Sequence, residues 1–202
     1  MLEFVLATHN KNKVREMERL LGQTLGNKVE FSVKTAEQVG VTDEIEENGS
    51  TFEENARIKA RALASDRYIS IADDSGLSVD ALGGAPGVYS ARWSGEGDAG
   101  NNQKLLRELE GKRGEERRAR FVTAVCCILP DGRELMLHGE CEGLILDAPR
   151  GEGGFGYDPL FLYEPLGRSF AELSGDEKNA VSHRGRAMRA LADRLAQIYI
   201  GG

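Results

Sequence analysis

The chain has 202 residues, of which 40% are hydrophobic and 29% are charged. These proportions are ordinary for a soluble globular protein, and a chain of this length buries enough surface to fold without a disulfide or metal staple. The net charge of −7 argues against a nucleic-acid-binding module, because such modules usually present a basic face. We therefore expect a single domain, residues 1–202, built from two lobes.

No run of about 18 apolar residues occurs in the sequence, so we expect no membrane span. The first seven residues are too short and too acidic for a signal peptide. The three cysteines, Cys126, Cys127 and Cys141, are odd in number and form no C-x-x-C motif. We interpret them as buried free thiols in a reducing compartment, which predicts a cytoplasmic protein.

A polar motif lies between the first predicted strand, 2–7, and a predicted helix whose apolar stripe runs from Val14 to Leu21. Unpaired N–H groups at the start of a helix bind anions. Two interpretations stay open: the lysines of the motif contact a phosphate, or one of its asparagines caps the helix and the lysines are solvated. The motif consists of Thr8, His9, Asn10, Lys11, Asn12 and Lys13.

Residues 29–33 read as a second strand, and the acidic segment 36–50 reads as a solvated loop. The pattern Thr51-x-x-Glu54 is a capping box that begins a helix with small apolar residues on its buried side. Lys59 lies off this buried stripe. It is either solvated or directed to a site near the start of the helix.

The segment 68–87 is the most informative part of the chain. Tyr68–Ala72 predicts a short buried strand that ends in Asp73 and Asp74, and a Gly-Gly-Ala-Pro-Gly loop follows. Two buried carboxylates are costly without a counter-charge, and oxygen ligands at a strand end suit Mg²⁺. The alternative is an Asx turn in which one aspartate caps the loop.

The middle of the chain indicates a helix around 105–109, a charged and solvated turn at 113–120, and a strand at 120–129. Pro130-Asp131-Gly132-Arg133 is a hairpin turn signal, with a return strand at 134–138 and a continuation of the sheet at 140–146. An antiparallel part in an otherwise α/β chain predicts a mixed sheet.

Two aromatic residues flank a glycine in the glycine-rich segment 151–161. Phe155 and Tyr157 lie on either side of Gly156, so both rings can stack on a planar base while Asp158 accepts hydrogen bonds from it. The alternative is that both rings belong to the core and the glycines only turn the chain.

Three cations lie near the start of the last predicted helix, whose buried stripe runs from Met188 to Ile198. We interpret Ser182 as its N-cap, which leaves His183 and Arg184 on the first turn, where positive charge opposes the helix dipole. Lys178, His183 and Arg184 therefore fit better as ligand groups than as structural residues.

Taken in order, several of these motifs resemble the inosine triphosphate pyrophosphatase family, the non-standard purine nucleoside triphosphate (XTP/dITP) diphosphatases. The resemblance extends from Val5 to about Leu195, and His9 departs from the glycine often found at its position. The motifs are Thr8–Lys13, Thr51–Ala56, Ala72–Leu77, Gly83–Gly87, Phe155–Pro159 and Glu177–Arg184.

This resemblance implies a mixed α/β (α+β) fold of two lobes around a long, partly antiparallel sheet, with the active site in the central cleft and a homodimeric assembly. It implies hydrolysis of ITP, dITP and XTP to the monophosphate and pyrophosphate with Mg²⁺, which removes deaminated purines from the nucleotide pool. Nucleic acid and membranes are not expected as partners.

The resemblance also implies roles for individual residues. Asp74 is the general base and a metal ligand, Asp73 supports it, and Glu46 or Glu47 completes the metal site. Lys13 and Lys59 match functional lysines. The residues expected to hold the nucleotide are Thr8, His9, Asn10, Lys11, Asn12, Lys13, Ser75, Phe155, Gly156, Tyr157, Asp158, Lys178, His183 and Arg184.

Selection of the base has a physical rationale. A donor such as Lys178, His183 or Arg184 aimed at the 6-oxo group of hypoxanthine would reject adenine, because adenine leaves that donor unpaired. Two other functions stay open at this point. One is a nucleotide-binding regulator without turnover, and the other is a related pyrophosphatase with a different base preference.

Overall fold

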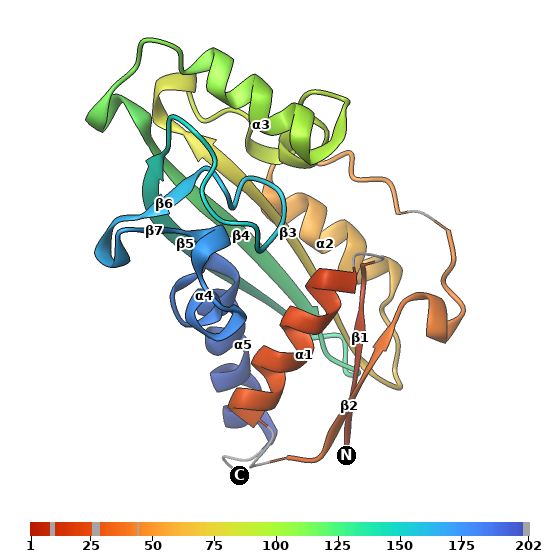
Figure 1. Cartoon of the computed structure of the whole chain (residues 1–202). Coiled ribbons are helices and arrows are strands. Elements are labelled where there is room, and N and C mark those ends of the chain that lie inside the picture. Colours follow the sequence, from red (N-terminus) through yellow and green to blue (C-terminus); the bar gives the residue numbers. More distant parts are fainter. Residues whose placement is uncertain (9–10, 26–28, 44, 200–202) are drawn as a thin grey trace. The chain divides into compact units, whose positions relative to one another are not determined.

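The computed structural model describes residues 1–8, 11–25, 29–43 and 45–199 (Figure 1), and the side chains of residues 11–13 and 24 lie outside this description. The described helices are α1 (Lys11–Leu25), α2 (Phe52–Ala62), α3 (Gly97–Glu108), α4 (Gly175–Val181) and α5 (His183–Tyr199). The described strands are β1 (Leu2–Leu6), β2 (Phe31–Thr35), β3 (Ile69–Val79), β4 (Arg118–Ile128), β5 (Glu134–Ile145), β6 (Phe161–Tyr163) and β7 (Arg168–Ser169).

Within the described residues the strands form one seven-stranded sheet in the order β2-β1-β3-β4-β5-β6-β7. β1 pairs in parallel with both β2 and β3, whereas β6 pairs antiparallel with β5 and β7. The predicted mixed, partly antiparallel sheet is therefore confirmed. β1, which sequence alone left as edge or interior, is an interior strand.

By its internal contacts the chain divides into two compact units. Unit 1 comprises residues 1–74, 123–139 and 184–202, and unit 2 comprises residues 75–122 and 140–183. Strands β3, β4 and β5 contribute residues to both units. Each unit has its own hydrophobic core.

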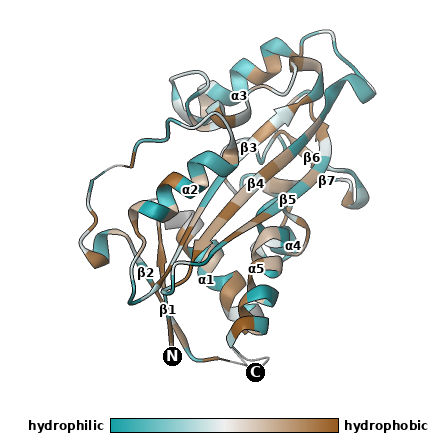
Figure 2. Cartoon of the chain, turned by 180° about the vertical axis from the view of Figure 1, so that it is seen from behind, coloured by the Kyte–Doolittle hydropathy of each residue, from teal (hydrophilic) through white to brown (hydrophobic). Residues whose placement is uncertain are grey.

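In unit 1, alternate strand residues face different helices, because successive side chains of a strand point to opposite faces of the sheet. One cluster joins the buried sides of α1 and α5 to strand residues that include Phe4, Leu6, Ile69 and Ile71. The neighbouring residues Val5 and Ala72 pack instead in a cluster with α2. Helices α1 and α5 therefore cover one face and α2 the other (Figure 1), and β1 between them is largely hydrophobic (Figure 2).

The core of unit 2 is aromatic. The ring of Phe121 lies 4.6 Å from that of Phe161, which in turn lies 4.8 Å from the ring of Phe170. The imidazole of His183 stacks on Phe121 with 4.8 Å between ring centroids and 11° between planes. Aromatic pairs at these separations stabilise a core beyond the area that they bury.

The strand expected to end at Ala72 continues to Val79 as β3. Asp73 and Asp74 therefore lie within a strand and not at its end, and the alternative Asx turn is also wrong. Both carboxylates are at least 94% buried, and each finds cationic or amide partners supplied by other elements. These tertiary partners override the turn preference of the two residues.

The bounds of several other elements differ from those expected from the sequence. β2 begins two residues later than expected, and residues 134–145 form one strand and not two. Residues 175–181 form α4, which the sequence did not predict, and Ser182 ends that helix directly before α5. Helix α2 begins as predicted, with the Thr51 hydroxyl accepting from Glu54 N–H. The Glu54 carboxylate accepts from both the N–H and the hydroxyl of Ser50, each at 2.7 Å.

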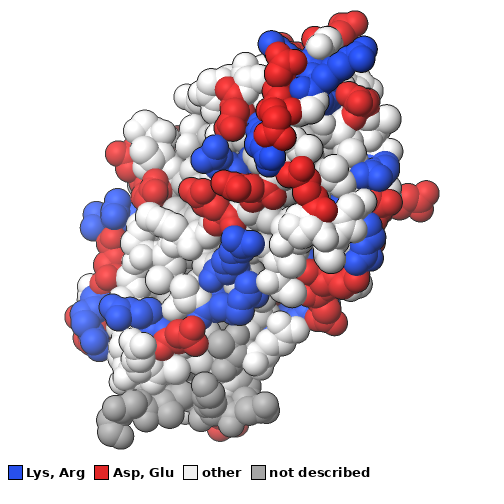
Figure 3. Space-filling view, turned by 90° about the vertical axis from the view of Figure 1, so that its left-hand side faces the viewer, with Lys and Arg blue, Asp and Glu red and all other residues white. Residues whose placement is uncertain are grey.

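On the face drawn in Figure 3, the described Lys and Arg side chains are interspersed with Asp and Glu side chains, in keeping with the mixed charge of the sequence. In the described part of the chain, no helix combines the length and the apolar character that crossing a bilayer requires.

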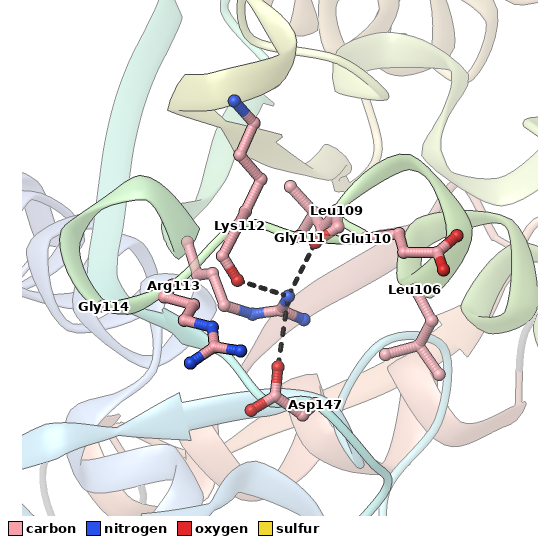
Figure 4. Close-up of a pocket in the computed structure, with 9 residues that line it drawn as sticks. Leu106, Leu109, Glu110, Gly111, Lys112, Arg113, Gly114 and Asp147 are labelled. Atoms are coloured by element: carbon pink, nitrogen blue, oxygen red, sulfur yellow. Dashed lines mark hydrogen bonds and ion pairs between the residues drawn. The ribbon is translucent and has the colours of Figure 1, made fainter.

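The segment predicted as a charged, solvated turn contains a buried arginine. The Arg117 guanidinium donates to the carbonyl oxygens of Ile145 at 2.6 Å, Leu109 at 2.9 Å and Leu146 at 2.8 Å. It also lies 3.2 Å from a carboxylate oxygen of Asp147. Arg117, Leu109 and Asp147 are among the residues that line a pocket of about 490 Å³ in unit 2 (Figure 4). The long side chain thus ties the residues after α3 to the end of β5.

We expect Arg117→Ala to lower the free energy of unfolding by about 3 kcal/mol, because several buried carbonyl groups lose a charged donor at once. Urea unfolding at neutral pH measures this change. Arg113→Ala is the control, since Arg113 lines the same pocket but is exposed, and it should stay within about 0.5 kcal/mol of the parent protein. Equal stability of both variants would contradict a structural role for Arg117.

The three cysteines are free and buried, as predicted. Burial raises the pKa of the Cys126 thiol to about 12 and also raises the pKa of Cys127. Since the thiolate is the reactive form, we expect the native protein to bind less than about 0.1 equivalents of a thiol reagent at about pH 8. Unfolding in guanidinium should then expose all three. Rapid labelling of the native protein would contradict the burial of these thiols.

Candidate active site

The Asp74 carboxylate in β3 is contacted by two side chains of α2. The amide nitrogen of Asn55 donates to Asp74 Oδ2 at 2.9 Å, and Lys59 Nζ lies 3.9 Å from Asp74 Oδ1. Asn55 and Lys59 are four residues apart, so they project from the same side of the helix. All three residues are more than 90% buried.

Lys59 also binds the acidic loop that precedes α2. Its Nζ donates to Glu47 Oε1 at 2.9 Å, which is shorter than its distance to Asp74. The ammonium group therefore lies between two carboxylates. Lys59 is therefore buried and not solvated, and the other interpretation, that it reaches a functional site, stays a prediction.

Of the two glutamates considered for the metal site, Glu47 shares the Lys59 cation with Asp74, whereas Glu46 is exposed. Among the described residues there is no group of three or more His, Cys, Asp or Glu side chains that could hold a metal ion. Two carboxylates nevertheless fit Mg²⁺, which commonly binds through one or two carboxylates together with substrate phosphates and water.

Asp73 points to the opposite face of β3. Its Oδ2 accepts from Arg184 Nε at 3.2 Å, and Arg184 Nη1 also donates to Glu16 of α1. Burial lowers the pKa of Arg184, but the carboxylates of Glu16 and Asp73 raise it overall. Arg184 is thus a buried cation shared by two carboxylates, and the adjacent aspartates are neutralised by different cations.

In unit 2, Lys178 of α4 forms a second charged group. Its Nζ donates to Asp158 Oδ2 at 2.6 Å and lies 4.6 Å from the centre of the Phe155 ring. Asp158 also accepts from the Phe155 N–H at 2.9 Å. A side chain at Gly154 would meet Asp158 Oδ2 at 2.1 Å, so only glycine permits this approach. Phe155 is half-buried, which leaves part of its ring accessible.

Tyr157 does not share that environment. It is 4% exposed, belongs to the core of unit 2, and donates its hydroxyl to the carbonyl oxygen of Ser90 at 2.8 Å. Of the predicted pair of stacking rings, Tyr157 is therefore a core residue, as the alternative interpretation held. The backbone of Gly156 is fixed to α3 through Asp98 and Asn102.

Of the remaining predicted site residues, some lie in the part of the chain that the structure describes and others do not. Ser75 lies in β3 and is half-buried, as is Thr8 after β1, and His183 begins α5 at the Phe121 ring. The predictions for His9 and Asn10 lie outside the described residues. Lys11, Asn12 and Lys13 form the first turn of α1, and their side chains also lie outside the description.

Sequence reasoning missed two residues of these networks. Asn55 was part of a recognised motif, but its contact with Asp74 is 19 positions away in sequence. Glu16 meets Arg184 across 168 positions. The available signal was periodicity: Asn55 precedes Lys59 by one helical turn, and Glu16 lies next to the buried stripe of α1.

Comparisons with known proteins identify the family of the chain. Residues 4–194 match the model of the Ham1 family. The chain is 47% identical to a dITP/XTP pyrophosphatase of Bacillus anthracis, with 100% of both chains covered. Its fold is similar to that of a HAM1 protein from Coxiella burnetii, with a TM-score of 0.86, 42% identity and coverage of 98% of this chain and 100% of the other. The Ham1 protein of Staphylococcus aureus gives a TM-score of 0.84 at 36% identity, over 97% and 99% of the two chains. The chain therefore belongs to the Ham1 family.

Proposed function

We propose that this chain hydrolyses non-standard purine nucleoside triphosphates, among them dITP, ITP and XTP, to the monophosphate and pyrophosphate. The observation that carries the proposal is the buried Asp74 carboxylate, fixed by Asn55 and Lys59 and joined through Lys59 to Glu47. The similarity to proteins named dITP/XTP pyrophosphatase over the full chain supports the choice of substrate. Removal of deaminated purines from the nucleotide pool follows from that reaction.

The chemistry needs a carboxylate beside the attacking water. In this proposal Asp74 accepts the proton of the water and orients it for attack on the triphosphate. Mg²⁺, held by Asp74 and Glu47, would supply positive charge to the phosphate oxygens. Lys59 contributes a further fixed positive charge, and the lysines of the Thr8–Lys13 motif stay predicted phosphate contacts.

Base recognition is proposed for the Lys178 group of unit 2. Phe155 offers the face of a ring, while Asp158 and Lys178 offer an acceptor and a donor that are already oriented by each other. A purine that lacks the matching 6-oxo group leaves a buried donor unpaired, which costs binding free energy. His183 and Arg184 stay predicted donors in this respect.

A substrate panel tests the proposal. Purified protein is incubated with dITP, ITP, XTP, dATP and dGTP at varied Mg²⁺, and pyrophosphate and orthophosphate are measured separately. We expect pyrophosphate from the first three substrates, little turnover of dATP and dGTP, and loss of activity in EDTA. Release of orthophosphate alone, or equal rates on all five, would contradict the proposed reaction or its specificity.

The same panel, extended to pyrimidine and other modified triphosphates and paired with a binding measurement, decides between this function and its alternatives. Nucleotide binding without product would indicate a regulator, and preference for a pyrimidine or other modified base would indicate a related pyrophosphatase. The resemblance also implies a homodimer, and the free thiols predict a cytoplasmic location. Light scattering coupled to size-exclusion chromatography measures the assembly in solution.

A further inference from the structure

The loop before α2, residues 45–50, is bound to that helix at three points between Glu54 and Lys59. Glu47 contacts Lys59, the Gly49 N–H donates to Asn55 Oδ1 at 2.8 Å, and Ser50 contacts Glu54. A Cβ at Gly49 would lie 2.7 Å from Asn55 Oδ1, so the loop backbone approaches Asn55 as closely as a glycine allows.

The orientation of the Asn55 amide follows from this contact. The Gly49 N–H can only donate, so the Asn55 atom facing it must be the oxygen. The amide nitrogen is thereby directed at Asp74 Oδ2, 2.9 Å away. Asn55 is fully buried, and a buried amide with both ends paired has one favourable rotamer.

Asn55 and Lys59 thus perform parallel tasks one helical turn apart. Each makes one contact with the 45–50 loop and one with Asp74. Asn55 contacts Gly49 in the loop and Oδ2 of Asp74, and Lys59 contacts Glu47 in the loop and Oδ1 of Asp74. Lys59 carries the charge and lies closer to Glu47, whereas Asn55 makes the shorter contact with Asp74.

We propose that Asn55 is a positioning residue: its amide holds the Asp74 carboxylate in its working orientation and keeps the 45–50 loop in place beside it. This inference rests on the proposed function, and it assigns Asn55 no contact with substrate. Partners that orient a reacting or ligating group typically change activity by about 10- to 100-fold when removed. A fall in kcat with little change in KM is expected, because substrate contacts are unaltered.

Two variants separate the two ends of the amide. Asn55→Ala removes both contacts. Asn55→Asp keeps an oxygen for the Gly49 N–H but removes the donor to Asp74 and places a second carboxylate there. We expect both variants to lose about 10-fold or more in kcat on dITP, with KM within about threefold. Protection of the Gly49 amide from hydrogen exchange should fall in Asn55→Ala and persist in Asn55→Asp.

Ser70→Ala is the matched control. Ser70 is buried in β3 on the same face as Asp74, and its hydroxyl donates to the carbonyl oxygen of Ala60 in α2 at 3.0 Å. The variant removes a buried contact between the same two elements without reaching the carboxylate. We expect a small drop in melting temperature and a kcat within about twofold of the parent protein.

This test can be told apart from a failure of the proposed function. If the proposed function is wrong, the parent protein itself releases no pyrophosphate. If the parent is active, kcat values of Asn55→Ala within about twofold of it would overturn the proposal. So would restoration of kcat in Asn55→Asp, because the loop contact alone would then suffice. An equal loss of kcat in Ser70→Ala would show a general effect of weakened packing and would also overturn it.

Discussion

Replacing Asp74 by asparagine is expected to lower kcat for dITP by about 10²- to 10⁴-fold while the protein stays folded. Asparagine has nearly the same shape, so the packing between β3 and α2 is kept. Its amide does not take up a proton at neutral pH and is a poorer ligand for a cation. Steady-state kinetics on dITP, with unfolding in urea measured in parallel, tests both halves of this expectation.

Asp66→Asn serves as a control, because Asp66 is an exposed carboxylate in unit 1. It should leave kcat unchanged. Asp73→Asn tests whether the two adjacent aspartates have different roles. It removes a charged partner of Arg184, so it should lower the free energy of unfolding more than Asp74→Asn does. Near-normal turnover by Asp74→Asn would refute the role of Asp74 as general base.

Arg184→Ala is expected to lower the free energy of unfolding by about 3–5 kcal/mol, because it leaves two buried carboxylates without their cation. Arg184 is 2% exposed and contacts both Asp73 and Glu16. Urea unfolding followed by circular dichroism measures the loss. The exposed Arg186 on the first turns of α5 gives the control, and Arg186→Ala should stay within about 0.5 kcal/mol.

The sequence predicts that Arg184→Ala affects activity on ITP far more than folding, as a pure ligand contact would. The ion pairs with Asp73 and Glu16 add a structural role, so a loss of stability alone no longer argues against substrate contact. Activity should therefore be compared at a temperature at which the variant is fully folded. A variant as stable as the parent protein would contradict the importance of the buried ion pairs.

Features that depend on residues close together in the sequence were predicted correctly. The apolar stripes of α1 and α5 are buried, the Thr51 cap begins α2, and the turn at 130–133 joins β4 to β5. Each depends on residues within a few positions of one another, where local geometry decides the outcome.

The structure shows contacts among the predicted residues that the sequence did not indicate. Ending the strand at Ala72 placed Asp73 and Asp74 together, although the alternation of a continuous strand directs them to opposite faces. The partner of Asp73 lies 111 positions away, and no local pattern identifies such a pair. Tyr157 was uncertain because a buried ring and a stacking ring have the same sequence signature.

The division of Asp73 and Asp74 between two faces of β3 has a use in protein engineering. On the α1 and α5 face, Asp73 is held in a buried ion pair with Arg184, whereas on the α2 face Asp74 is the residue proposed to carry the chemistry. A designer can therefore change Glu16 and its surroundings to raise thermal tolerance while leaving the chemistry proposed for Asp74 untouched.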